Sequence, residues 1–398
     1  MRTLNLPDDQ LNSRFHDIYR EYATDIIFCP YRIAPLGAHI DHQLGKILGF
    51  AIDVGTKVAY RPMENTRCEF VSIQYASQFY TETDIDEFVC KFPWSRYCQS
   101  AMFSLKQKYI LDYGMQAVID GPLPCVGLAS SASLILAIIV ALARVNHLTL
   151  SSKELIDLAH DAETRFLGVM CGELDPACEV LADADKILYL DCLDNSHALV
   201  DCHCTISYKW MICYSGLSAD LFALAYNKRR EECKEAAELL LTYAGIQTNA
   251  ESVTFRAVPD YIYKAFRNRL PDTLQKRADH FYSEMRRVEL GLSEWESGDL
   301  VRFGEFMTDS GNSSIVNYES GCLQLIELHN ILANTAGVYG TRSSVAGFRG
   351  CCIALIDASR ESEVRSAVTK KYISKFPELG GLFFTQCYDS CYGLHEVI

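Results

Sequence analysis

The stretch GPLPCVGLASSAS, residues 121–133, runs directly into an apolar segment with helical character at 131–145. Small residues let backbone N–H groups approach phosphate oxygens, and a following helix presents the positive end of its dipole to an anion. The hydroxyls of Ser130 and Ser131 add donors for phosphate or ligands for Mg²⁺. No GKS or GKT follows, and the HRD and DFG segments of protein kinases are absent. The pattern is typical of a phosphate-binding loop or, equally, of a serine-rich helix start.

A second segment, AETRFLGVMCGELDPACEVL at 162–181, carries two acids at useful places. Glu163 falls on a predicted helix, and Asp175 follows the turn-forming Gly172. One carboxylate for Mg²⁺ and another near an acceptor hydroxyl are the minimum set for phosphoryl transfer. Two solvated surface acids would give the same pattern.

A third segment, YRIAPLGAHIDHQLG at 31–45, places Arg32 in an apolar strand-like context. Burying such an arginine is costly without an anionic partner. His39, Asp41 and His42 crowd a turn that begins at Gly37, which is typical of sugar-hydroxyl sites and also of surface turns.

Composition excludes several functions. The 398 residues include 49% hydrophobic residues, enough for a large core, and a net charge of −14 disfavours nucleic acids and anionic membrane surfaces. The apolar run 134–143 is too short to span a bilayer. The 17 cysteines are irregularly spaced after a polar N-terminus, which favours buried thiols in a reducing, cytoplasmic compartment over a disulfide framework.

The order of elements predicts an α+β fold in two halves, residues 1–195 and 196–398. In the first half we expect helices at 9–24, 94–113, 131–145 and 151–167, and strands within 26–61, 115–119 and 186–192. In the second half we expect strands within 197–215, helices up to 246, at 274–310 and at 317–333, and a Gly-rich segment at 337–357.

Together these motifs resemble the GHMP kinases. GLASSAS is similar to the family's phosphate loop GLSSSAS, CGELDP to CGIMDQ, and GTRSSVAGFRGCC to GARMTGAGFGGC. CPYRIAPLGAHIDHQLG resembles the opening motif of the galactokinase branch, GRVNLIGEHTDYNGG, and is most similar to its galacturonokinase form. The resemblance covers nearly the whole chain. It implies a ribosomal protein S5 domain 2-like N-terminal half and a ferredoxin-like C-terminal half.

The resemblance also implies roles for individual residues. Asp175 would accept or orient the proton of an anomeric hydroxyl, and Arg32 would stabilise it and the transferring phosphoryl group. Ser131 and Glu163 would hold Mg²⁺. Sugar hydroxyls would bind Asp41, His39 and Tyr226. The ATP site would include Gly127, Leu128, Ala129, Ser130, Ser131 and Ala132, with Trp94 near the adenine unless it is a core residue.

The sugar is indicated by one difference from the galactokinases. Ala38 stands where they have Glu, which removes charge and bulk at the place where a uronic acid carries its own carboxylate. Arg349 and His42 are the candidate cations for that carboxylate. The resemblance therefore implies an ATP-dependent D-galacturonate 1-kinase, acting as a monomer or weak dimer. The alternatives are a kinase for galactose or L-arabinose and a non-catalytic sugar sensor, which Val345 in place of a motif glycine permits.

Overall fold

Two β-sheets occupy the centre of the computed structural model, which describes residues 3–75, 80–84, 92–124, 126–218, 223–247, 253–344 and 348–394. The first sheet has seven strands and the second has four. The first sheet contains β1 (Asp25–Leu36), β2 (Lys46–Pro62), β3 (Arg67–Ser72), β4 (Tyr80–Asp84), β5 (Met115–Asp120), β6 (Lys186–Asp191) and β7 (Ser196–Asp201). The second contains β8 (Tyr208–Tyr214), β9 (Val338–Ser343), β10 (Cys351–Asp357) and β11 (Phe384–Tyr388).

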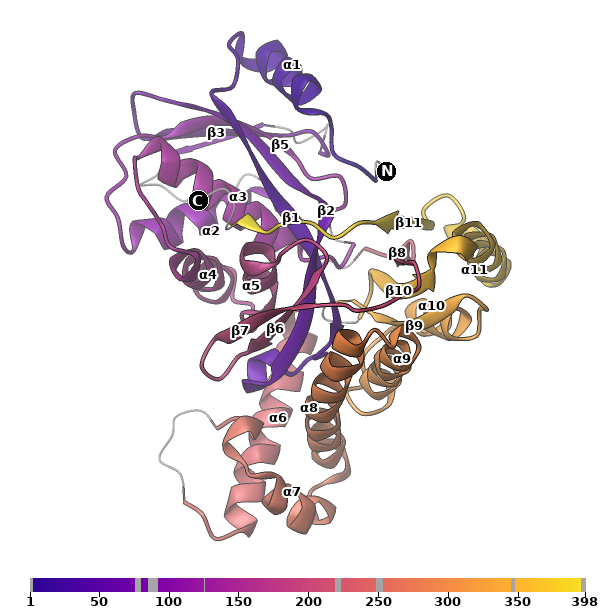
Figure 1. Cartoon of the computed structure of the whole chain (residues 1–398). Helices are drawn as coiled ribbons and strands as arrows, with labels where there is room; N and C mark the ends of the chain where they lie inside the picture. Colours follow the sequence, from indigo (N-terminus) through magenta and orange to yellow (C-terminus); the bar gives the residue numbers. More distant parts are fainter. Residues whose placement is uncertain are drawn as a thin grey trace.

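The long strand β2 organises the first sheet, whose order is β4-β3-β5-β2-β6-β7 with β1 paired to β2. One end of β2 pairs with β5 and the other with β6, and β1 runs antiparallel beside it. Only the β3–β5 pair is parallel in the described part of this sheet. Figure 1 shows β1 and β2 passing through the middle of the molecule.

The second sheet is antiparallel, with the order β11-β8-β10-β9. Helices connect β8 to β9, a short connection joins β9 to β10, and one helix joins β10 to β11. This β-α-β-β-α-β succession is that of ferredoxin-like folds, so the expected architecture of the second half is confirmed.

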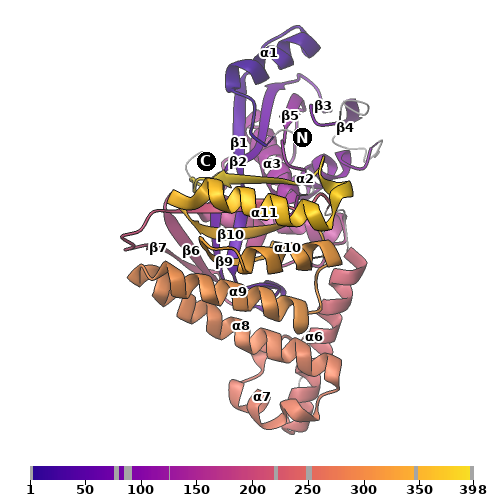
Figure 2. The ribbon, with the colours of Figure 1, turned by 90° about the vertical axis from the view of Figure 1, so that its right-hand side faces the viewer.

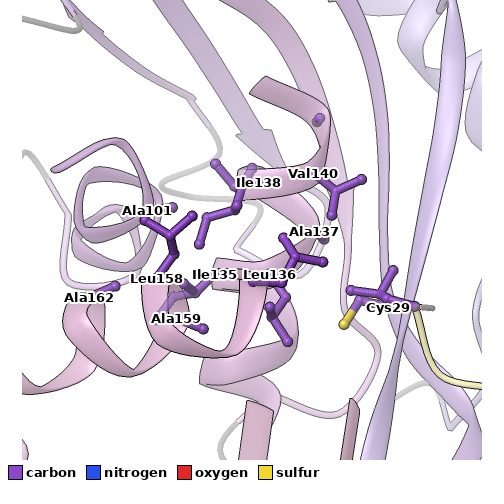
Figure 3. Packing of buried hydrophobic residues seen from close by; sticks show 14 of the residues in the cluster. Cys29, Ala101, Ile135, Leu136, Ala137, Ile138, Val140, Leu158, Ala159 and Ala162 are labelled. Atoms are coloured by element: carbon purple, nitrogen blue, oxygen red, sulfur yellow. The ribbon is translucent and has the colours of Figure 1, made fainter. Parts of the chain in front are cut away.

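Four helices cover one face of the first sheet: α2 (Ser95–Lys106), α3 (Ser130–Val145), α4 (Ser152–Asp161) and α5 (Leu174–Leu181). The central helix α3 is apolar almost all round, as a fully buried helix must be. Figure 3 shows its side chains, Ile135 and Ile138 among them, packed among Ala101 of α2, Leu158 of α4 and Cys29 of β1.

The remaining helices belong mainly to the second half. A second core fills the space between the two sheets and includes residues of α8 (Asp272–Ser297) and α9 (Leu300–Val316). A further core lies between the second sheet and helices α10 (Leu323–Ala333) and α11 (Glu361–Lys375) (Figure 2). A separate helical cluster extends away from the sheets. This cluster is formed by α6 (Ala223–Tyr243), α7 (Asp260–Phe266) and the first turns of α8. Helix α1 (Asp8–Tyr19) packs on the first sheet.

An irregularity at Pro30 determines where Arg32 points. The register between β1 and β2 shifts between Pro30 and Tyr31. Before the shift, Cys29 packs in the core under the helices, and after it Tyr31 packs in the core between the sheets. Side chains alternate along a strand, so Arg32 emerges on the helix side, toward α5.

Most predicted elements are present, with shorter bounds. The segment 274–310 was expected as one helix but forms two, because Gly298 adopts a left-handed φ of 85° and Asp299 caps α9 by accepting the N–H of Arg302. Strand β7 pairs with β6 and so extends the first sheet to Asp201. The domain boundary between residues 195 and 196 stays a prediction.

Two compositional expectations can be compared with the described ranges. No helix within them is long and apolar enough to cross a membrane. Every cysteine in the same ranges is a free thiol, and most are buried.

Gly49 of β2 is expected to be essential for the position of α5. A Cβ at this residue would overlap the sulfur of buried Cys178 on α5. Overpacking of this kind costs roughly 1–3 kcal/mol. Gly49→Ala should lower the thermal midpoint by several degrees and reduce turnover, whereas Gly381→Ala, where a Cβ meets open space, should change neither. Calorimetry with steady-state kinetics checks this, and an unchanged midpoint for Gly49→Ala would contradict it.

Candidate active site

A cavity of about 600 Å³ lies where β1, the loop before α3, and α5 meet. Strand β9 and helix α6 of the second half each contribute a lining residue, Arg342 and Tyr226. Eleven of the residues expected at the site line it: Arg32, His39, Asp41, Trp94, Gly127, Ala129, Ser130, Ser131, Glu163, Asp175 and Tyr226.

The central contact of the cavity is an ion pair between Arg32 and Asp175. Arg32 is 1% exposed, and its Nε donates to Asp175 Oδ1 at 2.8 Å while its Nη2 donates to the same oxygen. Burial opposes the charge of Arg32, but Asp175 outweighs it and holds the arginine pKa above its ordinary value. Within the described structure, Arg32 Nη1 donates no hydrogen bond and Asp175 Oδ2 accepts none. Both atoms therefore remain available to a ligand.

The second pair joins the first turn of α3 to the helical turn that follows α4. Ser131 Oγ donates to Glu163 Oε1 at 2.9 Å, and the thiol of Cys171 lies 3.5 Å from Glu163 Oε2. Glu163 stands in a π-helical turn, Ala162–Phe166. Burial, with the nearby charge of Asp175, raises the pKa of Glu163 to about 7.

The loop before α3 is held in a strained conformation. Gly127 has φ 99°, and Ala129, the residue before α3, has φ 60° in the left-handed region that alanine seldom adopts. No side chain caps the first turn of α3. The loop thus presents backbone N–H groups and the positive end of a 16-residue helix to the cavity.

Asp41 and His39 also line the cavity. Burial, aided by the charge of Asp175, raises the pKa of Asp41 to about 6, and burial lowers the pKa of His39 well below its ordinary value. Gly172 of the CGELDP motif lies against Asp41, because a Cβ there would come within 2.5 Å of Asp41 Oδ2. That close approach explains the glycine in the motif.

The ring of His39 is stacked on the ring of Tyr318. Its ring lies parallel to that of Tyr318, with centroids 4.2 Å apart, and Tyr318 Oη is 3.0 Å from His42 Nε2. His42 is thus part of the support and does not line the cavity. Its ring edge contacts Tyr226, whose side chain does line it.

Four other expected residues lie outside the lining. Ala132 is buried within α3, and Leu128 packs in the core between the sheets while its carbonyl accepts the N–H of Arg32. Ala38 is buried, and its methyl side chain does not reach the cavity. Arg349 is exposed in the bend before β10 and is not among the residues that line the cavity, so its expected role stays a prediction. Val345 lies outside the described residues.

Sequence reasoning missed several lining residues. The most important is Arg342 of β9, which is 2% exposed. Its signal was the one used for Arg32, an arginine within a strand of small and β-branched residues, in the third motif. Near Trp94 the cavity is also lined by Tyr75, Arg96 and Tyr97, and the rings of Tyr75 and Trp94 are parallel with centroids 6.2 Å apart.

Comparison with known families agrees with this geometry. Residues 96–182 match the GHMP kinases N terminal domain, and residues 291–374 match the GHMP kinases C terminal domain. A galacturonokinase from Arabidopsis thaliana is 34% identical, with 93% of each chain covered. A galactokinase from Roseiflexus sp. (strain RS-1) is 31% identical, with 92% of each covered.

Solved structures show the same relationship. Lactococcus lactis galactokinase complexed with galactose superposes with a TM-score of 0.88 at 27% identity, covering 97% of this chain and 98% of that one. Methanococcus jannaschii mevalonate kinase, at 16% identity and a TM-score of 0.64, shares the fold. The chain therefore belongs to the GHMP kinases, as a sugar kinase of the galactokinase and galacturonokinase type. Members of this family use ATP as the phosphoryl donor.

The raised pKa of Glu163 predicts a pH-dependent stability difference. Its pKa rises from 4.5 to about 7 on folding, so the stability that its proton confers is present below pH 4.5 and is lost as the pH rises through 7. Glu163→Gln cannot ionise. With a chelator present, the difference in unfolding free energy between the variant and the wild type should change in favour of the variant by on the order of 1–3 kcal/mol when the pH is raised from 5 to 8. Chemical unfolding at both pH values measures this, with exposed Glu296→Gln as control; equal differences at both would contradict it.

Proposed function

We propose that this kinase transfers the γ-phosphoryl group of ATP to the anomeric hydroxyl of D-galacturonate and forms the 1-phosphate. The observation that carries the proposal is Ala38, in the loop beside the sugar end of the cavity, where the galactokinase motif has Glu. A cavity end with arginines and without that acid suits a uronate better than a neutral hexose. The Arabidopsis relative, named a galacturonokinase, supports the same choice.

Asp175 and Arg32 would carry the chemistry. The anomeric oxygen attacks the γ-phosphorus, the bond to the β-phosphate oxygen breaks, ADP leaves, and the hydroxyl proton passes to Asp175 Oδ2. The ion pair holds this carboxylate in place at the wall of the cavity. Arg32 Nη1, which has no partner in the described structure, is available to the charge that develops on the phosphoryl oxygens.

The loop before α3 would bind the phosphates of ATP. Gly127 and Ala129 of this loop line the same cavity as the parallel rings of Trp94 and Tyr75, which would hold the adenine. These rings are apolar enough to hold a base.

Ser131 and Glu163 fit a magnesium ion. Both offer oxygen ligands, their oxygens lie 2.9 Å apart, and a divalent cation would relieve the cost of ionising a buried Glu163. When bound there, Mg²⁺ would neutralise charge on the phosphate oxygens of ATP.

His39, Asp41 and Tyr226 would bind the sugar hydroxyls. All three line the same end of the cavity as Asp175. The neutral imidazole of His39 and the carboxyl of Asp41 supply a donor and an acceptor, and the packing of Tyr226 against His42 holds its ring in place. Galactose remains the second candidate substrate, because the Lactococcus lactis relative was solved with galactose.

Asp175→Asn should abolish turnover and preserve the fold. The change is nearly isosteric, and loss of a positioned base typically lowers the rate by roughly 10²–10⁴-fold. Asp183→Asn is a matched control, because Asp183 is 20% exposed and pairs with Lys186 outside the cavity, against 21% for Asp175. Steady-state kinetics and thermal unfolding test the pair of variants. A loss in kcat below about tenfold would remove Asp175 from this role.

Ala38→Glu should move the two candidate substrates in opposite directions. Galacturonate would meet a second carboxylate and lose at least about tenfold in kcat/KM, since a charged hydrogen-bonding site is worth roughly 1.5–3 kcal/mol. Galactose would gain an acceptor for its 6-hydroxyl. Ala38→Gln adds the same bulk without the charge, and it should lower kcat/KM for galacturonate much less. Kinetics on both sugars measure these changes, and a parallel fall of both with Ala38→Glu would reject galacturonate as the substrate.

A further inference from the structure

A buried arginine at the sugar end of the cavity lacks an acidic partner. Arg342 of β9 is 2% exposed and lines the cavity. Its Nη1 donates to the carbonyl of Ala34 at 2.7 Å, and its Nε has no hydrogen-bond partner. No carboxylate in the described ranges lies within ion-pair distance of it. Such a burial is costly unless a ligand supplies the anion.

The nearest acid cannot fill this role. Glu284 of α8 influences Arg342, but its Oε2 already accepts Arg287 Nε at 2.8 Å. Its Oε1 accepts three bonds, from Gly37 N, Ala38 N and Ser310 Oγ. Burial lowers the pKa of Arg342 to about 10, and it therefore remains a cation at neutral pH.

A second orphaned nitrogen lies in the same wall. His39 Nε2 is buried without a hydrogen-bond partner, and its ring is held parallel to Tyr318. Burial comes first among the causes that keep its pKa low, followed by the charges of His280, Arg342 and His42. His39 is therefore a neutral neighbour of Arg342, able to donate one N–H.

The other arginines of the region are otherwise placed. Arg32 is committed to Asp175, and Arg96, two residues after Trp94, is exposed. Arg349 is exposed. Among the buried guanidinium groups that line the cavity in the described part of the chain, this leaves Arg342 as the one without a carboxylate of its own.

We infer that Arg342 binds the C6 carboxylate of the uronic acid substrate, while the neighbouring His39 Nε2 stays available to a sugar hydroxyl. The inference rests on the proposed function and names the residue that gives it specificity. A guanidinium matches the two oxygens of a carboxylate. Because Arg342 is already buried in the folded protein, binding a carboxylate adds little further cost of removing the guanidinium from water. The carboxylate that the galactokinase motif has at the position of Ala38 is then supplied by the substrate.

The test uses three sugars and the full-length enzyme: galacturonate, its methyl ester, and galactose. The ester has nearly the same size as the acid but no charge. Arg342→Met should lower kcat/KM for galacturonate roughly 10- to 100-fold, chiefly through KM, and change the two neutral sugars by less than about threefold. Arg342→Lys, which keeps the charge but not the planar fork, should give a smaller loss confined to galacturonate. Exposed Arg302→Met is the control, and Arg349→Met tests the competing arginine.

The outcomes are distinguishable. A parallel loss for all three sugars in the Arg342 variants, or a selective loss in Arg349→Met alone, overturns the role of Arg342 while the wild-type preference for galacturonate stands. A wild type that prefers galactose refutes the proposed function itself. If Arg342→Met does not fold, Arg342→Lys decides by the same comparison, and thermal unfolding of each variant identifies that case.

Discussion

The buried ion pair between Arg32 and Asp175 is the constraint on which the rest of the site depends. An arginine that is 1% exposed needs its partner, and the partner stands on a different element 143 residues away. The register shift at Pro30 turns Arg32 toward the helices, and Gly49 lets α5 approach β2 closely enough to bring Asp175 to it. Deleting either side chain would leave the other without its partner, which is strongly destabilising, whereas the near-isosteric Asp175→Asn keeps an oxygen that can accept from Arg32. Strand irregularity, glycine contact and catalytic geometry are thus parts of one arrangement.

The cavity gathers charges of both signs around this pair. Asp41 and Glu163 have raised pKa values because burial and Asp175 both oppose their ionisation, and Arg32 and Arg342 supply the positive charge. A chain of net charge −14 does not attract anions through its overall field. Anionic substrates must instead be recognised at short range, by buried guanidinium groups, by helix α3 and by backbone N–H groups of its loop. The two anions of the proposed reaction, ATP and a uronate, would meet these at opposite ends of one cavity.

Much of this arrangement could be predicted from the sequence, because each motif contains residues that are costly to bury without a partner. Arg32 with Asp175, and Ser131 with Glu163, were expected to act together, and both pairs are in contact. What could not be predicted was which side chain of a strand or bend faces inward. Arg342 and Arg349 are seven residues apart in one motif, and only the pairing of β9 with β10 puts the first in the cavity and leaves the second exposed. The break at Gly298 was missed for a related reason, since helical periodicity continues on both sides of it.

Direct competition between two sugars tests the central claim that the cavity is built for a carboxylate. The wild-type enzyme is given equimolar galacturonate and galactose with limiting ATP and Mg²⁺, and the initial sugar 1-phosphates are quantified by ³¹P NMR. Their ratio equals the ratio of kcat/KM for the two sugars. The account predicts at least about a tenfold excess of galacturonate 1-phosphate. Equal amounts, or an excess of galactose 1-phosphate, would contradict it.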